Sequence, residues 1–255
     1  MTVCFALQCR SPGRKGLDCS MKILAVESSA SAASAAVWED GKLLCESFTN
    51  IGLTHSQTLL PLVEQILDCA QIPFSEIGCY AVAVGPGSFT GVRIGVSLVK
   101  GLAFSSGTPC VPVSTLEAMA RLFTGQRVHV CCVMDARCNQ VYNALFSVDG
   151  EAVLRLCNDR AISIPDLKEE LSSNENNWVL VGDGAMLCWE SFGKTEEKFA
   201  LAPPHLRFQR ASGVALSAQE VYNQQRTVSA DQLAPVYLRL PQAERELKKR
   251  QAEQK

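Results

Sequence analysis

A short pattern that occurs twice in this chain restricts the folds available to it. Residues 23–26 form an apolar stretch that ends at Glu27, and a turn glycine, Gly41, follows 14 residues after the glutamate. Residues 130–134 form a second apolar stretch that ends at Asp135, with Gly150 lying 15 residues further on. Each copy is typical of a strand, an acidic residue at its end and a hairpin return.

The segments that follow also repeat in order. Residues 80–84 are apolar and lead to Gly85 and Gly87, and residues 178–181 lead to Gly182 and Gly184. A duplicated unit of this kind predicts an α/β fold of two related halves with a cleft between them. We expect the first half over residues 21–123 and the second over residues 124–240, with a helix near residues 214–224 free to pack across both.

Residues 85–95 read Gly-Pro-Gly-Ser-Phe-Thr-Gly-Val-Arg-Ile-Gly, directly after an apolar stretch and at the start of a helical pattern. A strand, a glycine turn and a helix start can cradle an anion, because glycine lets the backbone approach closely and the first helical N–H groups are unpaired. Ser88 is also suited to capping this helix. The candidate nucleotide- or anion-binding residues from this stretch are Gly85, Gly87, Ser88, Gly91 and Arg93.

The two acidic strand ends, Glu27 and Asp135, complete this candidate site. Facing a cleft, they could organise Mg²⁺ or water at a nucleotide phosphate, although acidic strand ends also occur in solvated turns. Phosphotransferases of this architecture usually carry glycine two positions after the acid, where this chain has Ser29 and Arg137. That difference weakens the case for tight ATP binding.

Arg93 occupies the first turn of its predicted helix, where a cation opposes the helix dipole. We expect a compensating negative group, which could be a bound anion or a carboxylate of this chain or of a partner.

Composition excludes several classes of protein. The 255 residues carry a net charge of −2, so no general basic field draws the chain to nucleic acid or to a membrane. No apolar run reaches the roughly 18–20 residues of a membrane span. The 12 cysteines are scattered without a Cys-x-x-Cys pair, which favours small apolar side chains in a reducing cytoplasm. The three histidines lack metal-ligand spacing.

The two ends of the chain differ from the rest. Residues 1–20 lack periodicity, and we interpret them as a disordered extension or a misassigned start, with Met21 as the working start and a transit peptide as the alternative. Residues 241–255 form a charged tail to which we assign no function.

Several motifs together resemble one family. They lie at residues 21–28, 55–61, 85–95, 113–116, 134–137 and 234–239, the last reading Ala-Pro-Val-Tyr-Leu-Arg. They are similar to the TsaB family, also called YeaZ, over residues 21–240. The resemblance implies the actin/Hsp70/sugar-kinase (ASKHA) fold, in agreement with the duplication.

The resemblance also implies a function. TsaB is a noncatalytic scaffold or activator of the complex that adds a threonylcarbamoyl group to the adenosine next to the anticodon, in tRNAs that read codons beginning with A. The catalytic paralogue, TsaD, carries two metal-binding histidines, and Thr115 and Met119 occupy the corresponding positions here. We therefore expect no catalytic residue, no metal site and no cofactor of the chain's own, with ATP or ADP and Mg²⁺ placed at the interface with TsaD.

The implied partners are TsaD, a P-loop ATPase (TsaE) and tRNA through the complex, with a homodimer when the chain is alone. Docking is expected on the helices predicted over residues 55–69 and 91–103, so that a charge at Val96 would block it and leave the chain folded. The six residues expected to contribute are Leu59, Val63, Ile66, Val92, Val96 and Val99.

Two enzyme alternatives stay open at this point. One is a small-molecule kinase of the same fold, which predicts tight binding of Mg-ATP by the isolated chain. The other is a metallopeptidase, which the lack of metal-spaced histidines disfavours.

Overall fold

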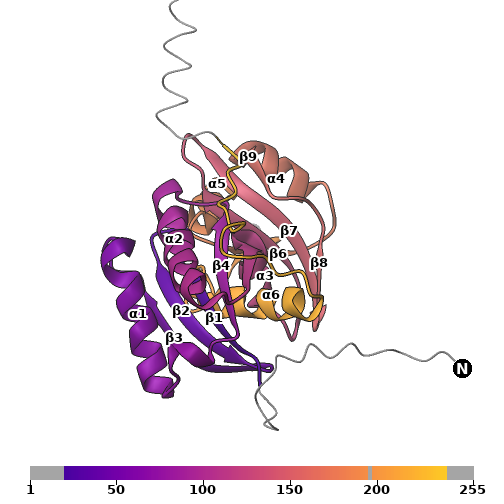
Figure 1. The fold of residues 1–255 in the computed structure, drawn as a ribbon. Helices are drawn as coiled ribbons and strands as arrows, with labels where there is room; N and C mark the ends of the chain where they lie inside the picture. The colour runs from indigo at the N-terminus through magenta and orange to yellow at the C-terminus, as the bar shows by residue number, and fades with distance from the viewer. Residues whose placement is uncertain (1–19, 195–196, 240–255) are drawn as a thin grey trace, which may run out of the picture.

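The computed structural model describes residues 20–194 and 197–239, which form two α/β halves (Figure 1). The predicted tail (241–255) and all of the predicted extension except Ser20 lie outside the described residues. Within those ranges, no helix is both long and apolar enough to cross a membrane.

The first half is built on a five-stranded sheet in the order β3-β2-β1-β4-β5. β1 pairs antiparallel with β2 and parallel with β4, and β4 pairs parallel with β5. The strands are β1 (Lys22–Glu27), β2 (Ala33–Glu39), β3 (Lys42–Thr49), β4 (Cys79–Gly85) and β5 (Cys110–Ser114). Its helices are α1 (His55–Ala70), the short η1 (Phe74–Glu76) and α2 (Phe89–Ser106).

The second half repeats this topology in its sheet, whose order is β11-β10-β6-β7-β8, with β9 also paired to β7. β6 is antiparallel to β7 and parallel to β10, which is parallel to β11. The strands are β6 (Gln126–Asp135), β7 (Gln140–Gly150), β8 (Ala152–Arg155), β9 (Arg160–Ser163), β10 (Trp178–Val181) and β11 (Phe199–Leu201). Its helices are α4 (Ile164–Ser172) and α5 (Ala185–Phe192). The predicted duplication is thus confirmed in the strand order of both sheets.

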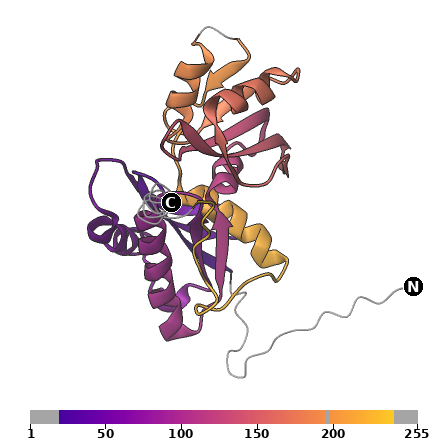
Figure 2. The same ribbon diagram turned by 90° about the horizontal axis from the view of Figure 1, so that it is seen from above.

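Helices cover both faces of the first sheet. Figure 2 shows α1 and α2 on one side of this sheet and α6 (Ala211–Asn223) on the other. Alternate residues of β1 belong to the two hydrophobic clusters on these opposite faces. The buried alanines of α6 let it lie close to the sheet, and Gly213 lets it approach α3 (Thr115–Arg121), because a Cβ there would overlap the carbonyl oxygen of Ala118. Helix α6 thus packs on the first sheet although it follows the second half in the sequence, and the prediction leaves it free to pack across both halves.

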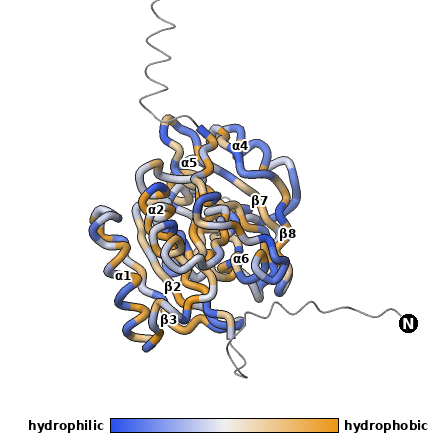
Figure 3. Tube along the Cα trace, viewed as in Figure 1, coloured by the Kyte–Doolittle hydropathy of each residue, from blue (hydrophilic) through white to orange (hydrophobic). Residues whose placement is uncertain are grey.

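The six residues predicted to dock a partner are core residues of the first half, which corrects that prediction. Apolar residues on α1 and α2 are spread over more than one side, and Figure 3 shows orange and blue alternating along α1. Spacing alone therefore does not separate the side that faces the sheet from the side that faces outward. The six residues are each at most 3% exposed: Leu59, Val63, Ile66, Val92, Val96 and Val99.

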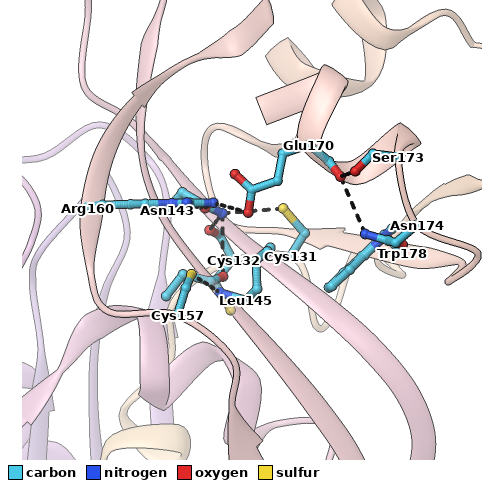
Figure 4. Close-up of polar contacts among 11 residues, drawn as sticks. Cys131, Cys132, Asn143, Leu145, Cys157, Arg160, Glu170, Ser173, Asn174 and Trp178 are labelled. Atoms are coloured by element: carbon cyan, nitrogen blue, oxygen red, sulfur yellow. Dashed lines mark hydrogen bonds and ion pairs between the residues drawn. The ribbon is translucent and has the colours of Figure 1, made fainter. Parts of the chain in front are cut away.

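A buried asparagine links strands of the second sheet (Figure 4). Asn143 on β7 is fully buried; its amide donates to the carbonyl oxygen of Cys132 at 3.0 Å, and its oxygen accepts from Arg160 on β9. Arg160 in turn pairs with Glu170 of α4 at 2.8 Å. The contacts fix the β6–β7 pair that carries Asp135 at its end.

The nine cysteines of the described ranges are free thiols, and five of them are buried. Burial raises the pKa of Cys79 to about 12, so that this thiol stays protonated and apolar. The five buried cysteines agree with the prediction that cysteines fill space in the core, whereas Cys69 and Cys138 are exposed.

Candidate functional site

A cleft of about 480 Å³ separates the two halves at the ends of their central strands. The turn after β1, the start of α2, the turn after β6 and the C-terminal residues 236–239 contribute its walls. Of the predicted site residues, Gly87, Ser88 and Asp135 line this cleft.

Glu27 and Asp135 make the same local contact in the two halves. The Oε1 atom of Glu27 accepts the backbone N–H of Ser29 at 2.6 Å, and the Oδ1 atom of Asp135 accepts the backbone N–H of Arg137 at 2.7 Å. In both cases the acceptor lies two residues before the donor and shapes the turn after the first strand. The sequence duplication therefore extends to the geometry of the acidic residues.

The surroundings of the two carboxylates differ. Asp135 is partly exposed, and its second oxygen pairs with the Arg137 guanidinium at 3.1 Å. Glu27 is fully buried, and its Oε2 atom has no hydrogen-bond partner. Burial raises the pKa of Glu27 to about 7, while the hydrogen bonds from Ser29 act in the opposite direction.

A third carboxylate, Asp183, lies at the cleft and was not among the predicted site residues. It follows β10 between Gly182 and Gly184, and Gln209 donates to it at 3.0 Å. Burial raises its pKa, and Asp135 adds to the shift. The sequence does contain a pattern that could have identified Asp183, because an acidic residue stands between two glycines directly after the apolar residues 178–181.

Contacts within the chain explain the glycines of residues 85–95. A Cβ on Gly87 would overlap the carbonyl oxygen of Ser29, and a Cβ on Gly91 would overlap that of Ser28. The Ser88 N–H donates to the Ser29 oxygen at 2.6 Å. The start of α2 is thus packed directly on the turn after β1. This close approach requires glycine even when no ligand is bound.

Gly85 is explained in the same way by the end of the chain. It has a φ of +119°, and a Cβ there would lie 2.5 Å from the carbonyl oxygen of Val236. In the second half, Gly182 and Gly184 pack against the backbone of residues 133–135. In both halves the glycines therefore allow backbone segments to pack closely beside the cleft, and Gly87 itself lines it.

The predicted cap of α2 is confirmed, since the Ser88 side chain accepts the N–H of Gly91 at 3.2 Å. Arg93 is exposed, and no carboxylate of the described ranges pairs with it. Its guanidinium lies 3.8 Å from the centre of the Phe89 ring, and its Nε atom donates to the Tyr237 hydroxyl at 2.7 Å. Among residues 20–194 and 197–239, therefore, no carboxylate acts as the compensating group, which was one of the three options expected.

A second hollow lies beside the cleft, between α1 and α2, with a volume of about 570 Å³. It shares Phe89 and Thr90 with the cleft, so the two are contiguous. We call it the α1–α2 groove; its ten lining residues are His55, Ser56, Leu59, Leu60, Phe89, Thr90, Arg93, Ile94, Ser97 and Leu98. Except for Leu59 and Arg93, these residues were missed as binding candidates.

Gly91 and Gly101 offer a matched test of the packing at the start of α2. Gly91→Ala should destabilise the chain by about 2–4 kcal/mol, because its new Cβ overlaps backbone that cannot move alone. Gly101→Ala lies on the same helix with nothing within 4 Å, and should stabilise it by about 0.5–1 kcal/mol. Urea unfolding of both variants measures the difference, and equal effects would show that the close approach at Gly91 is wrong.

The shared strand order and the cleft between the sheets define an α/β protein with the actin/Hsp70/sugar-kinase fold. A family model described as "tRNA N6-adenosine threonylcarbamoyltransferase" (TsaD) matches residues 50–247. The chain is 32% identical over 222 residues to the tRNA threonylcarbamoyladenosine biosynthesis protein TsaB of Escherichia coli, covering 86% of this chain and 95% of that protein. It is 31% identical to the protein of the same name from Bacillus subtilis, covering 88% and 96%. The chain belongs to the TsaB family, within this wider group of transferase-related proteins.

Two solved structures support this family assignment. YeaZ from Pseudomonas aeruginosa superimposes with a TM-score of 0.71 at 26% identity, covering 86% of this chain and all of that one. A second structure from the same organism, described as similar to peptidase YeaZ, gives a TM-score of 0.74 at 27% identity with the same coverage.

Proposed function

We propose that this chain is a noncatalytic subunit that supports a TsaD-like paralogue in adding a threonylcarbamoyl group to the adenosine next to the anticodon of tRNA. The relatives named as threonylcarbamoyladenosine biosynthesis proteins and the transferase family model support a role in this pathway. TsaE and tRNA are proposed as further partners of the complex, and a homodimer as the form of the chain alone.

The observation that carries the noncatalytic part is the packing of the glycine-rich turn. In a phosphate-binding site, glycines leave room for the ligand, whereas here Gly85, Gly87 and Gly91 are in contact with the chain's own backbone. Thr115 and Met119, at the positions of the paralogue's histidines, are both fully buried in the core. Neither side chain can replace an imidazole as a ligand of a hard metal ion.

The cleft does not fit a tightly held Mg²⁺-nucleotide. Glu27 has a free oxygen, but it is sealed in the interior, and Asp135 is engaged by Arg137. Within the part of the chain that the structure describes, no three Asp, Glu, His or Cys side chains are grouped closely enough for a metal ion. We therefore propose that any ATP or ADP with Mg²⁺ binds at the interface with the paralogue.

The α1–α2 groove is the proposed docking site, in place of the six core residues, of which only Leu59 also lines the groove. Its apolar lining and its two flanking helices suit an apolar helical surface of the partner. Leu60 is 41% exposed on this groove although it is large and apolar. Such exposure is expected where a partner covers the surface.

Leu60→Glu should reduce affinity for the purified paralogue by at least about 30-fold, because docking would bury an unpaired carboxylate. Isothermal titration calorimetry or biolayer interferometry with the two purified proteins measures this affinity. Leu154→Glu, at an exposed leucine on β8 of the other half, is the matched control and should bind normally. Unchanged binding by Leu60→Glu would refute the groove as the docking site.

The kinase alternative has no observation in its favour. It requires the isolated chain to bind Mg-ATP tightly, and calorimetric titration of the chain alone with Mg-ATP tests it. We expect no saturable binding in the micromolar range.

A further inference from the structure

The C-terminal motif of residues 234–239 is not explained by the proposed function. In the structure, residues 233–239 form a strap, yellow in Figure 1, that runs back along β4 to the mouth of the cleft. The Val236 N–H donates to the Val84 carbonyl at 2.7 Å, and Arg239 donates to the carbonyl of Ala136 in the second half, also at 2.7 Å. The strap is thus hydrogen-bonded to the first half through Val236 and to the second half through Arg239.

Between these two anchors, the strap orients Arg93. The Tyr237 ring packs against Phe89 with its centre 4.8 Å away, and the Tyr237 hydroxyl accepts the Nε–H of Arg93 at 2.7 Å. The Phe89 ring also packs against the Arg93 guanidinium, whose central carbon lies 3.8 Å from the centre of the ring. A long exposed side chain is therefore held in one orientation by a hydrogen bond and an aromatic face.

The held guanidinium lies at the wall of the α1–α2 groove. Among the described residues, its two terminal nitrogens have no hydrogen-bond or ion-pair partner, and none of the ten groove residues is acidic. The groove therefore presents one oriented positive charge beside an apolar surface of Leu60, Ile94 and Leu98. The complementary surface is an apolar helix face that carries one carboxylate.

We propose that Arg93, positioned by Tyr237 of the strap, is the charged anchor of the docking groove and binds an Asp or Glu side chain of the partner protein. The proposal rests on the proposed function, since the partner is the TsaD-like paralogue. It assigns a role to the cation at the start of α2, whose compensating charge is supplied by the partner. A protein carboxylate is favoured over an RNA phosphate because the surface around Arg93 is mostly apolar.

The test measures affinity for the purified paralogue at low and high salt. Arg93→Met should weaken binding about 10- to 50-fold and flatten the salt dependence, because an oriented ion pair is lost. Arg93→Lys should recover only part of this loss, since lysine lacks the planar fork. Tyr237→Phe keeps the ring, removes the hydroxyl and should weaken binding about 3-fold. Arg127→Met, at an exposed arginine of the second half, is the control and should bind normally.

The outcomes separate this inference from the docking site itself. If Leu60→Glu abolishes binding while Arg93→Met binds within about 2-fold of the unmodified chain, the anchor role is wrong and the groove stands. If both bind normally, the groove is wrong as well. If Arg93→Met leaves paralogue affinity intact but weakens tRNA binding by the assembled complex, the ligand is a phosphate and the proposal is overturned.

Discussion

Val96→Glu is expected to unfold the first half of the chain rather than to detach a partner from a folded one. Val96 is 3% exposed and packs in the core between α2 and the sheet. A carboxylate placed there would be buried without a partner and would destabilise the fold by about 4 kcal/mol or more, a large part of the stability of a typical domain. Circular dichroism and urea unfolding of the purified variant measure this.

Leu60→Glu provides the contrast for this experiment on the neighbouring helix. Leu60 already meets solvent, so a charge there should change stability by no more than about 0.5 kcal/mol. The two variants thus separate loss of folding from loss of docking. A folded Val96→Glu protein with normal unfolding would contradict the packing of α2 described above.

Glu27→Gln is expected to stabilise the chain at neutral and alkaline pH, but not in acid. The pKa of Glu27 is raised to about 7 in the folded state, against about 4.5 when unfolded. A carboxyl group with a raised pKa favours folding only while it is protonated. Its favourable contribution is complete below about pH 4.5, falls as the pH rises towards 7 and is gone above it.

Glutamine does not titrate, so the stability difference between variant and unmodified chain follows the titration of Glu27 and its coupling to Asp183. Raising the pKa of Glu27 from about 4.5 to about 7 corresponds to a stability difference that grows by about 3 kcal/mol between pH 4.5 and pH 8. Asp183, whose pKa is also raised, is present in both proteins, and its charge contributes to the raised pKa of Glu27. Urea unfolding across this pH range tests the prediction, with Asp149→Asn at an exposed carboxylate as control. A difference that stays constant with pH would mean that Glu27 is not buried in the folded chain.

Local features of the fold could be predicted from the sequence because each is determined by nearby residues. The strands around Glu27 and Asp135, the turns at Gly41 and Gly150, and the cap at Ser88 all depend on patterns a few residues long. Their symmetry predicted the two halves and the cleft.

Features that depend on long-range packing could not be predicted. The spacing of apolar residues on α1 and α2 indicated amphipathic helices, but not that Val63 faces the sheet while Leu60 faces the groove. The glycines of residues 85–95 indicated a close approach, and only the structure shows that Ser28, Ser29 and Val236 are what approaches. The contact of Tyr237 with Arg93 joins residues 144 positions apart. No local pattern contains such information.

The central claim is that the chain supports catalysis by a paralogue and performs none itself. The most direct measurement is threonylcarbamoyl transfer to tRNA with purified components, comparing the paralogue with its ATPase partner in the presence and absence of this chain, and this chain alone. We predict modified tRNA only when this chain and the paralogue are together. Modified tRNA formed by this chain alone, or full transfer in its absence, would contradict the account.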